Sequence, residues 1–206
     1  MNPIAHLIEL EHVEKHYGRE RVVAIESLAL DFGERVVITG LNGSGKSTLL
    51  RLLAGVSQPN RGLVRRNPAL DQASLGYVPQ SGGLYTELSI RANLAQRRRL
   101  WNLPETAPES AWYVQDLGLE PLLDKTPAEL SGGFQRLAAV ATALHVEPSW
   151  LLLDEPFYGL DKGRRDILEE RLRHLCNNLV LFVVTAPSVE FTDAARVVRM
   201  ENGRVL

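Results

Sequence analysis

The chain has 206 residues, of which 45% are apolar and 23% charged, the proportions of an ordinary globular domain with a sizeable core. Its 23 Lys and Arg against 25 Asp and Glu give a net charge of −2, so no global field draws it to nucleic acid or to an anionic membrane, and we expect no nucleic-acid partner. The single cysteine, Cys176, excludes an internal disulfide and fits a reducing compartment. Residues 1–6 lack the features of a secretory signal, and the longest apolar stretch, 179–184, is far below the ~18 residues of a membrane span.

The first half of the chain predicts three kinds of structure in turn. Residues 7–13, 22–25 and 28–32 alternate in hydrophobicity by about two, which predicts antiparallel strands. An apolar strand at 36–39 then leads into a helical run. Between about 81 and 130 the pattern becomes helical, and we interpret this segment as a helical subdomain inserted in a sheet domain.

The second half returns to alternating strands and helices. Apolar strands at 151–153 and 180–185 flank an amphipathic helix at 163–176. Continuous apolar strands between amphipathic helices predict an α/β fold with a mainly parallel, buried sheet. We therefore expect residues 1–206 to form one domain with an N-terminal antiparallel subdomain and the helical insert.

A phosphate-binding loop is predicted where the first parallel strand meets its helix. The segment Gly40-Leu41-Asn42-Gly43-Ser44-Gly45-Lys46-Ser47-Thr48 follows an apolar strand and opens a helix. The glycines let backbone N–H groups converge on a phosphate, Lys46 supplies a charge to the β- and γ-phosphates, and the Ser47 hydroxyl is placed for Mg²⁺. A simple Gly-rich turn explains the glycines but not Lys-Ser at this offset.

Two further motifs accompany the loop. The apolar strand that ends in Asp154 and Glu155 offers Asp154 for the Mg²⁺ shell and Glu155 as the base or orienting group for an attacking water. The second motif, Ser131-Gly132-Gly133 followed by Gln135 at a helix start, forms another anion-receptive N-terminus. A plain helix cap explains Ser131 but not the two glycines.

These three motifs, in this order, resemble the ATP-binding cassette (ABC) family, in particular the nucleotide-binding subunits of its transporters. The resemblance implies that Tyr17 stacks on adenine, that Gln80 contacts Mg²⁺ and couples nucleotide to the helical subdomain, and that Asp161 faces the partner subunit. The full set of expected site residues is then, for catalysis, Glu155, Lys46 and Gln80; for the metal, Ser47, Gln80 and Asp154; and for nucleotide, Tyr17, Gly40 to Thr48, Ser131, Gly132, Gly133, Gln135 and Asp161.

The resemblance also implies partners and a location. In this family two ATPase chains, identical or different, sandwich two ATP molecules head to tail, with the Ser-Gly-Gly segment completing the opposite site. The expected activity is ATP hydrolysis with Mg²⁺ that drives separate transmembrane permease subunits, from the cytoplasmic face of the membrane. The segment 81–94 and the residues Asp154 to Phe157 are similar to short exporter subunits.

One position departs from the family pattern. After the strand at 180–185 the family usually places a histidine that contacts the γ-phosphate, whereas this chain has Ala186. A methyl group cannot donate a hydrogen bond, so we expect nucleotide binding to survive and hydrolysis to be slower or differently organised. Two arrangements are open: a partner chain supplies its own histidine, or the site manages with Glu155 alone.

Other interpretations differ in the partners they require. The main alternative is a soluble ABC protein that acts as an assembly scaffold. A DNA-maintenance ATPase is disfavoured because the chain has no room for a long insertion, and a small-molecule kinase leaves the Ser-Gly-Gly motif unexplained. The run Arg97 to Arg99 is either a solvated helix face or a permease-docking surface.

Overall fold

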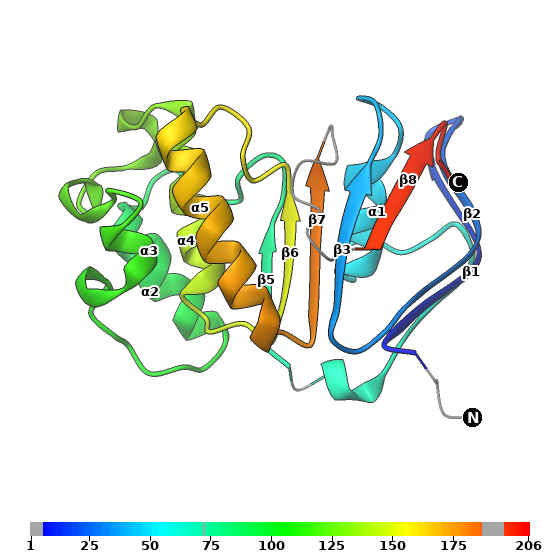
Figure 1. Ribbon diagram of the computed structural model, residues 1–206, viewed down its shortest axis with the longest axis horizontal. Helices are drawn as coiled ribbons and strands as arrows, with labels where there is room; N and C mark the ends of the chain where they lie inside the picture. Colours follow the sequence, from blue (N-terminus) through cyan, green and yellow to red (C-terminus); the bar gives the residue numbers. More distant parts are fainter. Residues whose placement is uncertain (1–5, 72, 187–195) are drawn as a thin grey trace. The chain divides into compact units, whose positions relative to one another are not determined.

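The computed structural model describes residues 6–71, 73–186 and 196–206 (Figure 1). Residues 1–5, on which the expectation of no secretory signal partly depends, lie outside these ranges. The chain divides into two compact units, one of Met1–Ala73 with Asn178–Leu206 and one of Ser74–Asn177. Within the described ranges, no helix is both long and apolar enough to cross a bilayer.

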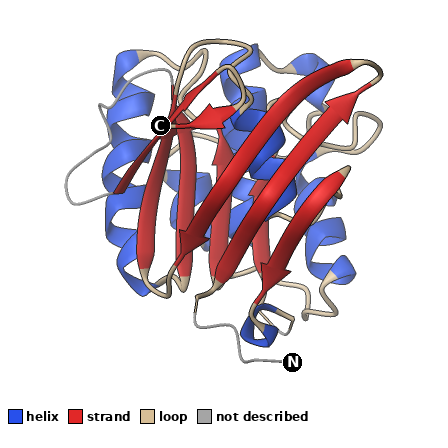
Figure 2. Cartoon of the chain, turned by 90° about the vertical axis from the view of Figure 1, so that its right-hand side faces the viewer, coloured by secondary structure: helices blue, strands red, loops and turns tan. Residues whose placement is uncertain are grey.

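An antiparallel sheet forms one layer of the first unit, and Figure 2 faces it. Its strands, in the order β2-β1-β4, are β2 (Glu20–Leu30), β1 (Ile8–Tyr17) and β4 (Arg61–Arg66). The predicted strand at 22–25 and residues 28–30 of the predicted strand at 28–32 belong to one continuous strand, β2. Strand β4 was not predicted, because Leu63 and Val64 are its only large apolar residues.

The first unit also holds parallel strands that carry the phosphate loop. Strand β3 pairs in parallel with β7 on one side and β8 on the other, and β8 ends in a hairpin with β9. These elements are β3 (Glu34–Thr39), β7 (Leu181–Ala186), β8 (Arg196–Glu201) and β9 (Arg204–Val205). The hairpin turns at Asn202 and Gly203, whose positive φ angles of 49° and 78° are those of a tight Asn-Gly turn.

Helix α1 (Lys46–Leu53) follows β3 and buries its apolar face in the core of the first unit. Leu49, Leu50, Leu52 and Leu53 are fully buried, and so is Val37 of β3. Burial of each such leucine contributes about 1.5–3 kcal/mol. This packing holds the start of α1 firmly beside the end of β3. A short 3₁₀ turn, η1 (Pro68–Leu70), completes this part of the chain.

The second unit combines two parallel strands with helices. Strand β5 (Leu75–Val78) pairs with β6 (Trp150–Asp154), whose five residues are all buried. Helix α4 (Gly132–Leu144) packs against β5, and α5 (Lys162–Leu175) follows β6 (Figure 1). A 3₁₀ turn, η5 (Cys176–Asn178), ends this stretch, and Cys176 is buried there as a free thiol. The mixed α/β class with mainly parallel pairing is confirmed.

The expected helical insert at 81–130 contains less helix than its pattern suggests. Its only long helix is α2 (Ile90–Leu100). The remaining turns are α3 (Trp112–Gln115), η2 (Pro108–Ser110), η3 (Glu120–Leu122) and η4 (Pro127–Glu129). Each of these 3₁₀ turns has a proline at its start. Proline is tolerated there, but it cannot stand in a helix interior because it lacks the backbone N–H that a helical hydrogen bond requires.

The arginine run at the end of α2 does not form one continuous surface. Arg98 is buried, and it donates hydrogen bonds to the carbonyl oxygens of Pro104 at 2.6 Å and His145 at 2.7 Å and pairs with Glu147 at 2.9 Å. Arg99 is exposed and pairs with Glu105. Neither a solvated face nor a docking surface therefore describes Arg98, which joins two segments of the second unit.

Candidate nucleotide site

The phosphate loop lies between β3 and α1 in the backbone conformation that its glycines predict. Gly40, Gly43 and Gly45 have φ angles of 152°, 80° and 101°, a region that other residues rarely adopt. A Cβ at Gly40 would lie 2.3 Å from the carbonyl oxygen of Met200, so this glycine is also required by close packing against β8. The loop borders a cavity of about 460 Å³ whose other wall is residues 199–202.

Two side chains of the loop are poised for an anionic ligand. Lys46 is 5% exposed, and its Nζ donates to the carbonyl oxygens of Gly40 at 2.7 Å and Leu41 at 3.1 Å. Ser44 is 6% exposed, and its Oγ has no hydrogen-bond partner among the described residues. A buried hydroxyl without a partner is costly, so Ser44 fits a site in which ligand oxygen completes the hydrogen bond.

Ser47 and Thr48 follow in the first turn of α1, half-buried and buried respectively. Leu41 and Asn42 are exposed at the tip of the loop. These residues all lie in one segment, as their sequence spacing requires.

Tyr17 ends strand β1 and remains 45% exposed. Burial tends to raise the pKa of its hydroxyl, but hydrogen bonds with Arg51 and Thr48 outweigh this effect and lower the pKa. Because both partners belong to α1, the ring is tied to the helix that begins with Lys46. The Nζ of Lys15 lies 5.5 Å from the ring centroid. An exposed ring anchored in this way can stack on a planar base.

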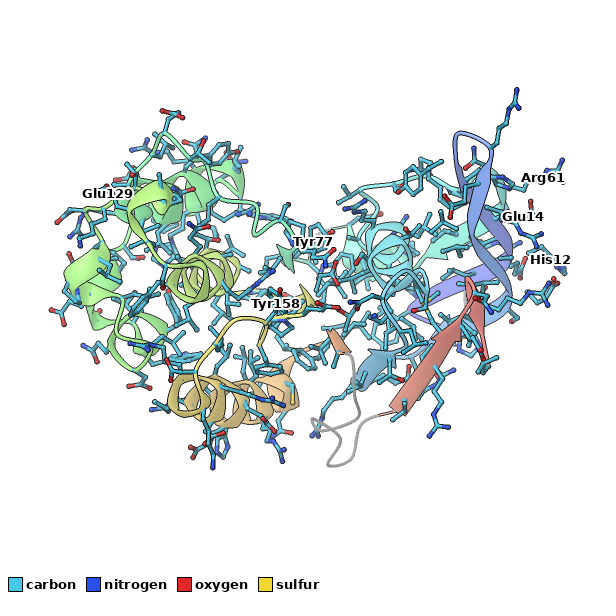
Figure 3. All side chains as sticks on the ribbon, turned by 90° about the horizontal axis from the view of Figure 1, so that it is seen from above. His12, Glu14, Arg61, Tyr77, Glu129 and Tyr158 are labelled. Carbon is cyan, nitrogen blue, oxygen red and sulfur yellow. The ribbon has the colours of Figure 1, made fainter. Side chains whose placement is uncertain are left out.

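Ala186 ends β7 beside the phosphate loop. It is the register partner of Thr39, the residue directly before Gly40, and it is 8% exposed. Of the five histidines in the sequence, His6, His12 and His16 belong to the first unit, where each pairs with a carboxylate, respectively Asp31, Glu26 and Glu14. His12 and Glu14 lie on the antiparallel sheet (Figure 3). These three imidazoles are therefore engaged with carboxylates of the first unit.

The paired carboxylates terminate β6 in the second unit. Asp154 is fully buried, whereas Glu155 is half-buried and has a φ of 49°. A non-glycine residue in this left-handed region carries strain of about 1–3 kcal/mol. The two neighbouring carboxylates thus differ in burial and in backbone conformation. Such strain is common at sites where a side chain must be aimed.

Gln80 follows β5, two residues beyond Val78, which pairs with Leu153 of β6. It lines a cavity of about 520 Å³ in the second unit together with Ser131, Gly132, Gly133 and Gln135. The neighbouring strands β5 and β6 therefore place Gln80 and Asp154 at the same edge of their ladder. The loop after β5 and the start of α4 therefore line the same cavity.

The Ser-Gly-Gly motif opens α4. The Ser131 hydroxyl accepts from the N–H of Phe134 at 3.4 Å and so caps the helix. The Gln135 amide donates inward to the carbonyl oxygens of Pro127 and Leu130 at 2.9 and 3.1 Å. Gln135 therefore stabilises the segment that precedes α4, and its expected contact with nucleotide stays a prediction.

The segment after Glu155 lies against this helix start. A Cβ on Gly133 would be 2.8 Å from the carbonyl oxygen of Gly159, so the two glycine backbones are in close contact. Tyr158, labelled in Figure 3, is 73% exposed beside them and lines the same cavity. Asp161 caps α5 by accepting from the N–H of Arg164 at 3.0 Å.

Hydrogen bonds from the Arg164 backbone and guanidinium hold the pKa of Asp161 below its usual value. The guanidinium of Arg164 also lies 4.3 Å from the centre of the Phe134 ring, a cation–π contact. Asp161 is thereby linked through Arg164 to the first turn of α4. Sequence reasoning missed this contact, because Arg164 lies outside the motifs and 30 residues separate it from Phe134.

The expected residues thus fall into two groups. Tyr17 and the loop from Gly40 to Thr48 belong to the first unit, and Gln80, Ser131 to Gln135, Asp154, Glu155 and Asp161 belong to the second. Among the residues described, no group of three or more His, Cys, Asp or Glu side chains could hold a metal ion. Within the second unit, Asp154 and Gln80 offer one carboxylate and one amide oxygen, and oxygen donors of these kinds suit Mg²⁺. The individual roles of the expected site residues in binding and catalysis stay predictions.

Comparison with known proteins identifies the class. A family model described as ABC transporter matches residues 25–158. The chain belongs to the ABC transporter family and is an ABC-type ATPase domain. The resemblance inferred from the three motifs is therefore confirmed.

Several relatives are similar over most of this chain. The sulfate/thiosulfate import ATP-binding protein CysA of Escherichia coli K12 is 36% identical over 214 residues, which are 96% of this chain and 58% of CysA. The Fe(3+) ions import ATP-binding protein FbpC of Pseudomonas fluorescens is 35% identical over 220 residues, 97% of this chain and 60% of FbpC. The chain thus spans about three fifths of the length of these curated relatives.

Among solved structures, the dimeric bacterial ABC transporter cassette MJ0796 matches with a TM-score of 0.83 and 26% identity, and 96% of each chain is covered. A second dimeric structure of MJ0796, in a post-hydrolysis state with ADP and Pi, matches with a TM-score of 0.80 and 25% identity, over 96% of each chain.

Proposed function

We propose that this chain is the ATP-hydrolysing subunit of a membrane transporter, in which two ATPase chains close around ATP and open after hydrolysis to drive separate transmembrane permease subunits. The observation that carries the proposal is the loop from Gly40 to Gly45, whose left-handed glycines lead into a buried Lys46 and a partnerless Ser44 hydroxyl. It is supported by relatives that are ATP-binding proteins of importers and by the dimeric state of the cassette MJ0796.

The residues of the loop bind the phosphates. The backbone N–H groups of residues 43–48 donate to the β-phosphate, and Ser44 Oγ gains a partner there. Lys46 Nζ exchanges the carbonyl oxygens of Gly40 and Leu41 for oxygens of the β- and γ-phosphates, so the ammonium keeps its hydrogen bonds. Tyr17 stacks on the adenine ring through its exposed face.

Ser47, Asp154 and Gln80 are proposed to hold Mg²⁺, which when bound offsets negative charge on the triphosphate. The Glu155 carboxylate orients the attacking water and accepts a proton from it as the bond from the water oxygen to the γ-phosphorus forms. The bond between the γ-phosphorus and the β,γ-bridging oxygen breaks in the same step, and ADP leaves with the electron pair. Ala186 offers no donor to the γ-phosphate, so Glu155 carries this part of the reaction without an imidazole beside it. Slow basal turnover is the expected result.

The test uses the full chain with Mg²⁺ and ATP. The wild-type chain should bind ATP and release phosphate. Glu155→Gln should bind ATP but release no phosphate, and Lys46→Ala should lose ATP binding. Glu170→Gln, an exposed carboxylate on α5, is the matched control and should hydrolyse ATP like the wild type. ATP should also shift Glu155→Gln to a dimer in sedimentation velocity. Full activity in Glu155→Gln would contradict the proposal.

The membrane role is tested separately. We propose a location at the cytoplasmic face of the membrane, held through the permease. Purification of the tagged chain from mildly solubilised native membranes should recover a multi-span membrane protein in matching stoichiometry, identified by mass spectrometry. Recovery of soluble partners only would instead support an assembly scaffold, the alternative that also uses an ABC-type ATPase domain.

The direction of transport has two candidates. The segment 81–94 and Asp154 to Phe157 are similar to short exporter subunits, and this similarity is the basis for proposing export. The importer names of CysA and FbpC favour import as the second candidate. Transport assays in inverted vesicles that hold the assembled complex distinguish them, because ATP added outside drives an exporter to accumulate its substrate inside.

A further inference from the structure

Arg136 is a buried cation in the second turn of α4, at the centre of the second unit. The residue is 7% exposed. Its Nη2 donates to the carbonyl oxygen of Gln80 at 2.6 Å, and its Nη1 donates to that of Pro79 at 3.0 Å. Nη1 also approaches the carbonyl oxygen of Asp154 at 3.5 Å. One guanidinium therefore contacts the loop after β5 and the end of β6.

The segments that Arg136 contacts carry three of the expected site residues. Gln80 is in the first segment, and Asp154 and Glu155 are in the second. Arg136 itself lies three residues beyond Gly133, in the helix that the Ser-Gly-Gly motif opens. The Arg136 side chain thus contacts Gln80, 56 residues away in the sequence, and Asp154, 18 residues away. This side chain thus connects the Gln80 segment and the Asp154-Glu155 pair with the helix that the Ser-Gly-Gly motif opens.

The contacts require an arginine rather than a generic cation. A guanidinium presents its N–H donors in a rigid plane, so it can serve several carbonyl oxygens at fixed angles, whereas the ammonium of lysine is a single point. Burial lowers the pKa of Arg136, and the carboxylates of Asp154 and Glu155 counter this effect. The charge is therefore balanced by the two acids whose strand end it contacts.

The carbonyl of Asp154 also belongs to the peptide that leads into Glu155, whose φ is 49°. A hydrogen bond to this carbonyl restricts rotation of that peptide, and the direction of the Glu155 side chain depends on it. Bonds to the carbonyls of Pro79 and Gln80 restrict the backbone that carries the Gln80 amide in the same way.

We infer that Arg136 is a positioning residue for ATP hydrolysis, which holds Gln80 and the Asp154-Glu155 pair in one arrangement through their backbone carbonyls. The inference rests on the proposed function and deepens it, because it assigns to the first turns of α4 a role within the chain's own second unit. Arg136 touches neither nucleotide nor metal in this role. Its loss should affect turnover and the contribution of Mg²⁺, but leave the phosphate loop intact.

The test compares Arg136→Met and Arg136→Lys in the full chain. Loss of a residue that orients metal ligands typically reduces activity or metal affinity by about 10–100-fold, and we expect kcat to fall by that amount in Arg136→Met. The affinity for the fluorescent analogue mant-ATP without Mg²⁺ should stay within about threefold, while the gain in affinity on adding Mg²⁺ should shrink. Arg136→Lys restores the charge but not the planar donors, so it should recover little of kcat.

Arg98→Met is the matched control, because Arg98 is equally buried in the same unit and also donates to two backbone carbonyls, away from these motifs. It should lower the unfolding temperature and keep kcat per folded molecule and the Mg²⁺ effect. Wild-type kcat in Arg136→Met, or full recovery in Arg136→Lys, would overturn the inference. If Arg136→Met does not fold, Arg136→Lys alone decides. An inactive wild-type chain would instead overturn the proposed function, and the inference with it.

Discussion

Ala186 and Thr39 are register partners at the ends of β7 and β3, and Thr39 directly precedes the first glycine of the phosphate loop. The methyl group of Ala186 therefore lies one strand away from the start of that loop, where a longer polar side chain could reach toward bound phosphate. Ala186 thus lies beside the start of the loop without a side-chain hydrogen-bond donor.

We expect Ala186→His to raise basal ATP hydrolysis by about tenfold or more, because an imidazole can donate to the γ-phosphate or to water and a methyl group cannot. The measurement is kcat for phosphate release by the full chain or the assembled complex. Ala186→Leu adds bulk without a donor and should not raise kcat. Unchanged turnover in Ala186→His would show that Ala186 does not limit the rate.

Ser44→Ala should change stability and binding in opposite directions. Its Oγ is buried without a hydrogen-bond partner among the described residues, so its removal should raise the unfolding free energy of the nucleotide-free chain by about 1 kcal/mol. The same change should weaken ATP binding by about fivefold or more, because a donor to phosphate is lost. Urea unfolding and mant-ATP titration measure the two effects. Loss of stability without nucleotide would contradict the assignment.

Gly133→Ala should lower the stability of the chain, whereas Gly132→Ala should not. A Cβ on Gly133 would approach the carbonyl oxygen of Gly159 to 2.8 Å, whereas one on Gly132 would meet nothing within 4 Å. Overpacking of this kind costs about 1–3 kcal/mol, and it would displace either the start of α4 or the segment of Tyr158. Thermal unfolding of the two variants provides the comparison. Equal behaviour of the two variants would argue against the close glycine contact.

The buried His145 should make the protein less stable in mild acid. Burial lowers the pKa of His145 to about 4 from an ordinary value of 6.5, and the Arg98 guanidinium adds to this effect. Between these values the unfolded chain binds a proton that the folded chain does not, so the unfolding free energy decreases as the pH falls from 6.5 toward 4. Above 6.5 this contribution to stability is fully present.

Urea unfolding across this pH range measures the slope. His145→Asn should reduce the slope, and His174→Gln, at an exposed position of α5, should leave it unchanged. The Tyr113 hydroxyl lies 2.6 Å from Nδ1 of His145, so the absolute stability of His145→Asn will also fall. A wild-type slope in His145→Asn would exclude His145 as the source.

Arg98→Ala should destabilise the second unit by about 2–4 kcal/mol, because it leaves the carbonyls of Pro104 and His145 without their donor. Arg99→Ala removes only an exposed ion pair with Glu105, and its effect should stay within about 0.5 kcal/mol. Chemical unfolding of both variants tests the difference. If Arg98→Ala unfolds like the wild type, the buried contacts of Arg98 are not important for stability.

Much of the candidate site could be predicted because its signals are local. The phosphate loop follows from glycines that permit positive φ, set between an apolar strand and a helix start. The Asn202-Gly203 hairpin and the Ser131 cap depend in the same way on a few neighbouring residues. Their conformations are determined by backbone sterics and short-range hydrogen bonds, which can be inferred from the residue types of a short segment.

Strand β4 and the unequal roles of Arg97 to Arg99 were not predictable. Strand β4 has only a short apolar pattern and forms because β1 offers it an edge to pair with. The burial of Arg98 depends on carbonyls of Pro104 and His145, the second of them 47 residues away. Nothing in a basic run distinguishes its middle member from its neighbours.

The sequence by itself determined the family, the α/β class and the positions of the motifs, since each follows from residue spacing and the period of hydrophobicity. Only the tertiary structure decided that Arg136 contacts the carbonyls of Pro79 and Gln80, that Gly133 lies against Gly159, and that Ala186 is paired with Thr39. These relationships join segments far apart in the chain, and they arise from packing and strand register, which no local pattern encodes.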